Sequence, residues 1–190
     1  MKSMTSLILV LPPVLCFCLA LQPLATNGAD ETPANNVTNI LLKKVCDSSE
    51  DKNLCYSTFN ANPDSQNSDL TGLAMIGLKI ASKNATQIVE YINKRMNENN
   101  LDPMLQQGLT DCSDEYLDAA EQLDDSVAAL LADAFKDLKT WVNAAIADAV
   151  SCQEAFERRP GIEPVIDFNN GIFLKLCNNI LIVNKLLAGQ

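Results

Sequence analysis

The chain has 190 residues, which is long enough for one domain with its own hydrophobic core. It contains no histidine, and this excludes Ser-His-Asp and Cys-His catalysis as well as histidine-ligated zinc. Its formal net charge of −10 makes nucleic acids and anionic membranes poor partners, and no glycine-rich phosphate-binding loop follows a strand pattern. We therefore expect a protein that is not an enzyme and that uses no cofactor or metal.

Residues 1–29 are predicted to be a secretory signal peptide. Lys2 supplies a positive start, an apolar stretch follows over residues 7–21, and small residues lie between Ala20 and Ala29. A pair of prolines interrupts the apolar stretch, which is also short for a membrane span. We expect a secreted protein that is cleaved somewhere between Ala20 and Ala29.

Residues 30–190 are expected to form one all-helical domain that begins with a helical hairpin over residues 37–59. The two helical pieces of this hairpin are too short to be stable in isolation. Ser48 or Ser49 is positioned to cap the second piece. The polar residues 60–65, which include a proline, end the hairpin.

Four longer amphipathic helices are predicted over residues 68–187, because apolar residues recur there at steps of three and four. The first covers residues 68–96, the second starts at Pro103, and the fourth covers residues 165–187. We place the turn between the second and third helices near Ala132, although no glycine or proline marks it. No stretch alternates with a period of two, so no sheet is expected. The predicted fold is an up-down-up-down four-helix bundle preceded by the hairpin.

Five cysteines lie after the signal peptide: Cys46, Cys55, Cys112, Cys152 and Cys177. An oxidising compartment favours two disulfides and one free thiol among them. A bridge between Cys46 and Cys55 would fix the hairpin, while Cys112 and Cys152 fall on the apolar stripes of the second and third helices. The alternative is that these cysteines are buried thiols. No Cys-x-x-Cys pair is present, so neither a metal site nor a redox site is expected.

Two Asn-x-Thr sequences, at Asn36 and Asn84, are candidate N-glycosylation acceptors in a secreted protein. Such sequences also occur by chance, so the sequence leaves their occupancy open.

Asp114, Asp118, Glu121 and Asp125 are predicted to form an acidic stripe along the second helix, because they follow one another at steps of three or four residues. Repulsion between like charges at this spacing costs a few tenths of a kcal/mol per pair. The stripe is either a plain solvated surface or a surface for a partner. Trp141, the only tryptophan, is either a packing residue, which is the usual case, or an interface anchor.

Two stretches place a cysteine on an alanine-rich amphipathic helix. Residues 109–120 contain Asp-Cys-Ser-Asp-Glu-Tyr-Leu-Asp-Ala, and residues 140–152 begin Thr-Trp-Val-Asn-Ala-Ala and end on a cysteine. These stretches resemble the plant invertase and pectin methylesterase inhibitor family, and the resemblance extends over about residues 37–187. It implies a hairpin that leads a four-helix bundle. It also implies that the first four cysteines pair in order, first with second and third with fourth, which leaves Cys177 reduced.

The resemblance implies a protein that binds pectin methylesterase or an acid invertase one to one and blocks its active-site cleft through the second and third helices, centred on the acidic stripe. Invertase inhibitors often carry a Pro-Lys-Phe motif between the third and fourth cysteines, where this chain has Ala134-Phe135-Lys136. That difference favours pectin methylesterase. Residues 161–165 are similar to the plane-tree pollen allergen branch of the family, and this similarity favours invertase.

We further expect a monomer rather than a dimer, located in the apoplast or cell wall, with the vacuole as an alternative. A different class of function stays open, namely a secreted structural or ligand-carrying bundle without an enzyme target.

Overall fold

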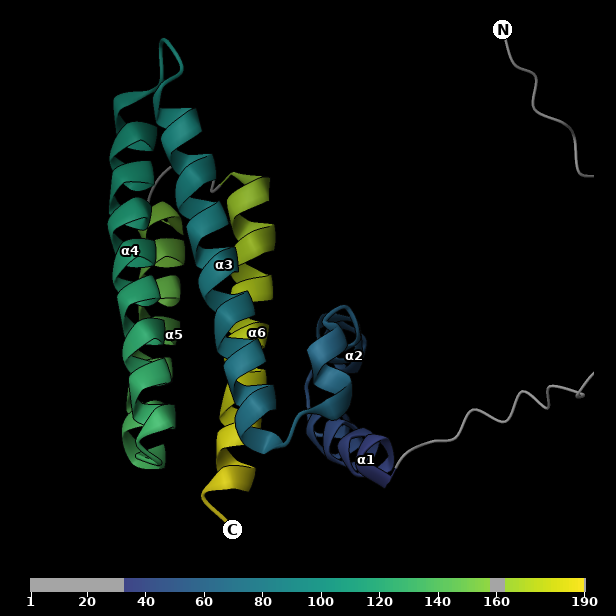
Figure 1. Cartoon of the computed structure of the whole chain (residues 1–190). Coiled ribbons are helices and arrows are strands. Elements are labelled where there is room, and N and C mark those ends of the chain that lie inside the picture. The colour runs from purple at the N-terminus through teal and green to yellow at the C-terminus, as the bar shows by residue number, and fades with distance from the viewer. Residues whose placement is uncertain (1–32, 158–162, 190) are drawn as a thin grey trace, which may run out of the picture. The chain divides into compact units, whose positions relative to one another are not determined.

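The computed structural model describes residues 33–157 and 163–189, with side chains from 40 to 156 and from 163 to 189. These residues form α-helices and one 3-10 helix, without any strand (Figure 1). The elements are α1 (Pro33–Asp47), α2 (Lys52–Asn60), η1 (Pro63–Asn67), α3 (Leu70–Met96), α4 (Pro103–Leu131), α5 (Phe135–Glu157) and α6 (Pro164–Leu187). The all-α prediction is confirmed, whereas the predicted signal peptide lies outside the described residues.

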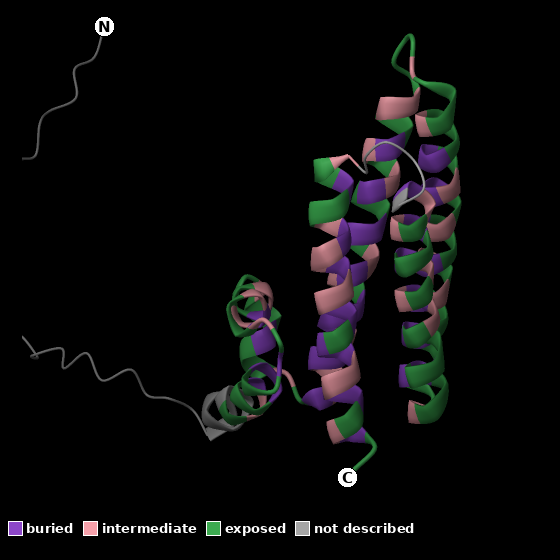
Figure 2. Ribbon diagram, turned by 180° about the vertical axis from the view of Figure 1, so that it is seen from behind, coloured by how far each residue is buried: buried purple, intermediate pink, exposed green. Residues whose placement is uncertain are grey.

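Helices α3 to α6 form the four-helix bundle that the apolar periodicity predicted. Each helix packs against the next along the chain, and α6 returns to pack against α3 (Figure 1). Buried residues gather on the sides where these helices face one another (Figure 2). Tyr116 of α4 packs edge to face against Phe173 of α6, with ring centroids 5.4 Å apart, and its hydroxyl donates to Asn170 Oδ1. The buried hydroxyl therefore has the hydrogen-bond partner that burial requires.

Aspartates begin three of the helices. Asp51, Asp69 and Asp102 each precede a helix and accept hydrogen bonds of 2.8 to 3.2 Å from backbone N–H groups in its first turn. The predicted cap of α2 by Ser48 or Ser49 is therefore wrong, because these serines lie in the turn before Asp51 and Asp51 adjoins the first helical residue. The same kind of cap makes α3 begin two residues later than predicted.

The turn between α4 and α5 ends a helix without glycine or proline. Asp133 has a φ of 54°, in the left-handed region that aspartate tolerates better than most residues. Its N–H donates to the Leu130 carbonyl at 3.2 Å, and the Ala134 N–H donates to the Ala129 carbonyl at 2.9 Å. These bonds satisfy two of the last carbonyls of α4. The turn predicted near Ala132 is confirmed.

Both disulfides implied by the family resemblance are present. Cys46–Cys55 joins α1 to α2 with Cα atoms 5.4 Å apart, and Cys112–Cys152 joins α4 to α5 with Cα atoms 4.4 Å apart. Cys177 on α6 is the free cysteine among the described residues. It is fully buried, and this burial raises the pKa of its thiol. The thiol therefore stays protonated and packs as a small apolar side chain.

The hairpin of α1 and α2 meets both α3 and α6. Phe59 of α2 is buried near Gly77 of α3, where an added Cβ would come within 3.0 Å of Ile180 on α6. Glycine at this position thus allows the two bundle helices to approach closely. Lys175 of α6 donates to Asp51, the cap of α2, at 3.0 Å. Helix α1 itself begins four residues earlier than predicted.

In the part of the chain that the structure describes, no helix has the length and apolar character needed to cross a membrane. The same residues contain no group of three or more His, Cys, Asp or Glu side chains that could hold a metal ion.

Candidate partner-binding face

The acidic stripe lies on the outer side of α4. Asp114, Asp118, Glu121 and Asp125 are all exposed, whereas Tyr116 of the same helix is fully buried. Residues three and four apart share one side of a helix, so the four carboxylates line a single surface. The structure therefore brings the four predicted residues together over about three turns of exposed helix.

Two further carboxylates extend the stripe toward α5. Partial burial raises the pKa of Glu115, and the charges of neighbouring α4 aspartates raise it further. Burial raises the pKa of Asp148, on α5, to about 6, and the charges of Glu115 and Asp118 add to this effect. Gln122 Nε2 of α4 donates to Asp148 Oδ2 at 3.0 Å, which ties the two helices together beside the stripe. Negative potential thus accumulates across the seam between α4 and α5.

Glu115 and Asp148 are not part of the predicted stripe, because charge spacing along one helix does not reveal contacts with another helix. The alignment of α4 with α5, which the cysteine pair sets, indicates that these two residues lie close together. Cys112 and Cys152 face each other, Glu115 follows the first by three residues, and Asp148 precedes the second by four. In antiparallel helices, both residues therefore lie about one turn away from the disulfide, toward the same end of the helix pair. A predicted disulfide therefore gives enough information to pair charges across helices.

Trp141 is exposed and does not belong to the core. Its exposed fraction is 38 %, which excludes a core position but not a packing role between helices, so its role as an interface anchor stays a prediction. It precedes Asp148 by seven residues, or about two turns, and the two residues therefore share one side of α5. Since Asp148 contacts α4, Trp141 borders the α4–α5 seam. We use the term α4–α5 face for the acidic stripe together with Glu115, Asp148 and Trp141.

The α4–α5 face is held by covalent and packing contacts. The Cys112–Cys152 disulfide is fully buried beneath it, and the two helices pack along their lengths. Ionised carboxylates only accept hydrogen bonds, and the indole N–H only donates one. The face can therefore bind cationic and hydrogen-bond-donating groups of a partner around an apolar anchor. It does not combine a nucleophile with a general base.

The two predicted glycosylation acceptors have different surroundings. Asn84 lies in the middle of α3 and is only 9 % exposed, and its Oδ1 has no hydrogen-bond partner among the described residues. A glycan there would have to displace neighbouring side chains, so the burial argues against modification of the folded protein. The side chain of Asn36 lies outside the described residues. Glycosylation at either position stays a prediction.

Comparison with known proteins gives a consistent result. A family model described as "Plant invertase/pectin methylesterase inhibitor" matches residues 40–183. The "Pectinesterase inhibitor" of Actinidia deliciosa is 27% identical over 172 residues, which cover 90% of this chain and 92% of the relative. The "Putative invertase inhibitor" of Platanus orientalis is 29% identical over 148 residues, which cover 77% of this chain and 86% of the relative.

Among solved structures, the chain is similar to a mutant form of a pectin methylesterase inhibitor from Arabidopsis. The TM-score is 0.68 at 22% sequence identity, and the match covers 76% of this chain and 95% of the other. At this identity the similarity shows a shared fold.

Proposed function

Because the chain belongs to the plant invertase/pectin methylesterase inhibitor family, we propose that it binds a plant cell-wall carbohydrate-active enzyme and covers the active-site cleft of that enzyme, with pectin methylesterase as the favoured target. Membership of this family makes the protein an enzyme inhibitor and not itself an enzyme. Inhibition is then a matter of binding and occlusion, without a covalent step.

The observation that carries the proposal is the α4–α5 face. A surface on two long helices joined by a disulfide loses little conformational freedom when it docks, so less binding free energy is spent on ordering it. The exposed carboxylates of the acidic stripe attract a basic surface and accept hydrogen bonds from it. Trp141 adds an aromatic anchor beside these charges, and aromatic anchors commonly dominate binding at interfaces.

Two observations favour pectin methylesterase over acid invertase as the target. The relative named as a pectinesterase inhibitor aligns with 90% of this chain, a larger share than the relative from Platanus orientalis. In addition, α5 begins Phe135-Lys136 after Ala134, without the Pro-Lys-Phe motif. Acid invertase is the second candidate, because the relative from Platanus orientalis bears the name of an invertase inhibitor and is 29% identical.

The surroundings of the protein follow from the same proposal. A cell-wall target requires secretion to the apoplast, or delivery to the vacuole for a vacuolar invertase, and the predicted signal peptide over residues 1–29 would provide the route. We propose a one-to-one complex with a monomeric inhibitor, since one α4–α5 face per chain supports one binding event.

Inhibition assays on a pectin methylesterase and an acid invertase, run side by side with the mature chain from residue 30 onward, test this function. We expect inhibition of the pectin methylesterase at concentrations that leave the invertase active. A titration followed by size-exclusion chromatography should show saturation at one inhibitor per enzyme. Inhibition of the invertase alone would replace the favoured target by the second candidate.

Failure to inhibit a panel of both enzyme types would contradict the inhibitor function. A pull-down from cell-wall extract then distinguishes the remaining class. Recovery of a carbohydrate-active enzyme would redirect the search to another target, whereas a folded bundle that recovers none would agree with a structural or ligand-carrying protein.

A further inference from the structure

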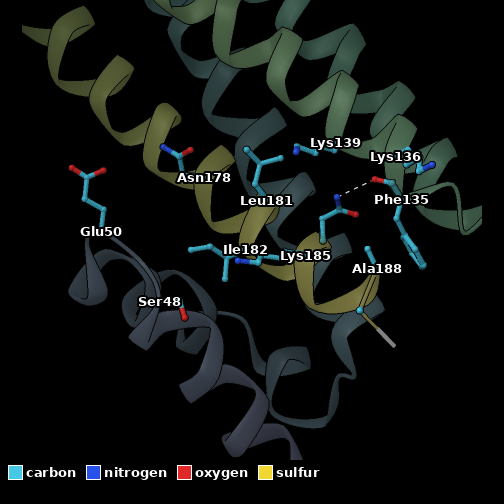
Figure 3. A pocket seen from close by; sticks show the side chains of 12 residues that line it. Ser48, Glu50, Phe135, Lys136, Lys139, Asn178, Leu181, Ile182, Lys185 and Ala188 are labelled. Carbon is cyan, nitrogen blue, oxygen red and sulfur yellow. Dashed lines mark hydrogen bonds between the residues drawn. The ribbon is translucent and has the colours of Figure 1, made fainter.

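A groove lies where α5 begins, α6 ends and the hairpin turns. Its volume is about 860 Å³, within the range that small-molecule sites occupy. Figure 3 shows Ile182 and Lys185 of α6 on the side of this space that faces Ser48 of the hairpin, with Lys136 and Lys139 of α5 along another wall. Three separate segments of the chain thus line one open groove.

The floor of the groove is apolar because some apolar side chains of α6 are not buried in the bundle core. Ile180, Val183 and Leu187 of this helix are buried in the bundle. The intervening Leu181 and Ile182 are only partly buried, and both line the groove. Apolar side chains left in a concavity lose contact with water when an apolar ligand enters, which favours such a ligand.

Three lysines line the same groove, namely Lys136, Lys139 and Lys185. None of them forms an ion pair with any side chain that the structure describes, in contrast to Lys43 and Lys175, which pair with aspartates. Glu50, on the hairpin, is the carboxylate among the lining residues. The groove therefore has an excess of positive charge, although the chain as a whole carries −10.

The lysines lie next to the apolar floor and not at a distance from it. Lys185 follows Leu181 by four residues and Ile182 by three, so all three lie on neighbouring parts of one side of α6. Asn184 is 4 % exposed, and its Nδ2 donates to the Phe135 carbonyl at 3.0 Å (Figure 3). Its Oδ1 has no hydrogen-bond partner among the described residues.

We propose that this groove binds a small amphiphilic anion, with its apolar body along Leu181 and Ile182 and its single carboxylate or sulfate in the positive field of the lysines that line the groove. Both parts of such a ligand are needed. An apolar body without charge leaves the lysines unpaired, and an anion without an apolar body gains little from the floor. The inference concerns a different surface from the α4–α5 face, and it holds whichever enzyme the protein inhibits.

A long polyanion, such as a chain of uronic acids, is a poorer candidate for the same groove. Its charges would continue past the lysines and meet the field of a strongly acidic protein, which salt screens only beyond about 8–10 Å. A small ligand places its one charge within the positive region and keeps the rest of its body apolar.

Isothermal titration calorimetry with laurate tests the proposal, using the mature chain at pH 7 and laurate well below its micelle-forming concentration. We expect saturable binding at one laurate per chain. Decanoate, which is two methylenes shorter, should bind about tenfold more weakly. Octyl glucoside and dodecyltrimethylammonium, as neutral and cationic amphiphiles, should bind much more weakly than laurate. Oligogalacturonate serves as the polyanion in a parallel titration and should not saturate.

Charge variants assign the binding to this groove. The triple variant Lys136→Gln, Lys139→Gln, Lys185→Gln should weaken laurate binding at least about tenfold, because charged hydrogen bonds are lost. The matched control Lys79→Gln, Lys83→Gln, Lys94→Gln removes the same charge from exposed positions on α3 and should bind laurate as the parent does. Glu50→Gln should tighten binding a few-fold, a gain that misfolding cannot produce.

Absence of saturable laurate binding would overturn the proposal, as would equal binding by the groove triple variant and its control. Equal affinity for octyl glucoside would show that charge plays no role, and tighter binding of oligogalacturonate would replace the amphiphile by a polyanion. None of these outcomes bears on the inhibition assays, so failure here and failure of the inhibitor function are distinguishable.

Discussion

The α4–α5 pair and the α1–α2 hairpin are both helical hairpins closed by a fully buried disulfide, yet the bridge has a different task in each. In α4–α5 it joins helices of 29 and 23 residues across 40 positions of sequence. In α1–α2 it spans 9 positions, and α2 has only 9 residues, of which Cys55 and Phe59 are buried. Long amphipathic helices bury enough apolar surface to hold one another, whereas a nine-residue helix depends on its cross-link and its neighbours.

The largest effect is expected from removing each bridge in turn. Replacing Cys112 and Cys152 by alanine should lower the free energy of unfolding by roughly 4 kcal/mol, because the bridge closes a loop of about 41 residues. Replacing Cys46 and Cys55 should cost roughly 2.7 kcal/mol, and the loss should be concentrated in the hairpin. Urea denaturation measures the totals, and hydrogen exchange measures where protection is lost. Equal losses, or a hairpin variant less stable than the bundle variant, would contradict this difference between the regions.

Charge reversal compares the two regions as binding surfaces. Replacing Asp114 and Asp118 by lysine should raise the inhibition constant at least about tenfold at low salt and less at moderate salt, because exposed charges act mainly on association. The melting temperature should change little, since both side chains are exposed. Asp47→Lys with Glu50→Lys makes the same change of charge on the hairpin and serves as the matched control. A stronger effect of the hairpin variant would move the binding surface to α1–α2.

Truncating one exposed apolar side chain in each region tests whether Trp141 is an anchor for the partner. Trp141→Ala should weaken inhibition by about 1–2 kcal/mol, or roughly tenfold, if the indole is buried in the complex. Ile40→Ala removes a side chain of α1 that is 61 % exposed and should leave inhibition unchanged. Both inhibition constants are measured against the same enzyme, and circular dichroism confirms the fold. Parent-like inhibition by the tryptophan variant would remove Trp141 from the interface.

The smallest effect concerns pH, where the two regions should respond with opposite sign. Burial raises the pKa of Asp148 from 3.8 to about 6, so its ionisation lowers the free energy of unfolding as the pH rises through that window. Asp148→Asn should therefore stabilise the protein above pH 6, by less than about 1 kcal/mol after allowance for solvent screening, and have no effect below pH 4.

Asp51 on the hairpin provides the contrast. Its hydrogen bond from the Leu54 N–H, and then the Lys175 ammonium, lower its pKa, so its contribution to stability is present above pH 4 and is lost as the pH falls through the lowered value. Asp51→Asn should be destabilising at pH 7 and neutral in strong acid. Thermal melts of both variants between pH 3 and pH 8 measure the two slopes, and slopes of the same sign would contradict the assignment.

Apolar spacing determined the helices and the bundle, because a stripe at steps of three and four residues can be buried only against other helices. The cysteines and the family resemblance together determined both disulfides. Two features depended on tertiary structure. Asp51 replaced the predicted serine caps because capping requires adjacency to the first turn. Trp141 lies outside the core, with 38 % of its surface exposed, which the spacing of apolar residues along one helix did not reveal.

Tertiary structure alone also decided which charges act together. Along the sequence, Glu115 and Asp148 belong to different helices, and Lys136 and Lys185 are 49 positions apart. Helix periodicity predicts the face of its own helix on which a residue lies, but it does not predict which residue of another helix lies next to it. The register of α4 against α5, and the way α5, α6 and the hairpin converge, placed the first pair on the acidic α4–α5 face and the second in the basic groove. Charge interactions depend on distance in space, and for these residues only the packing of helices sets that distance.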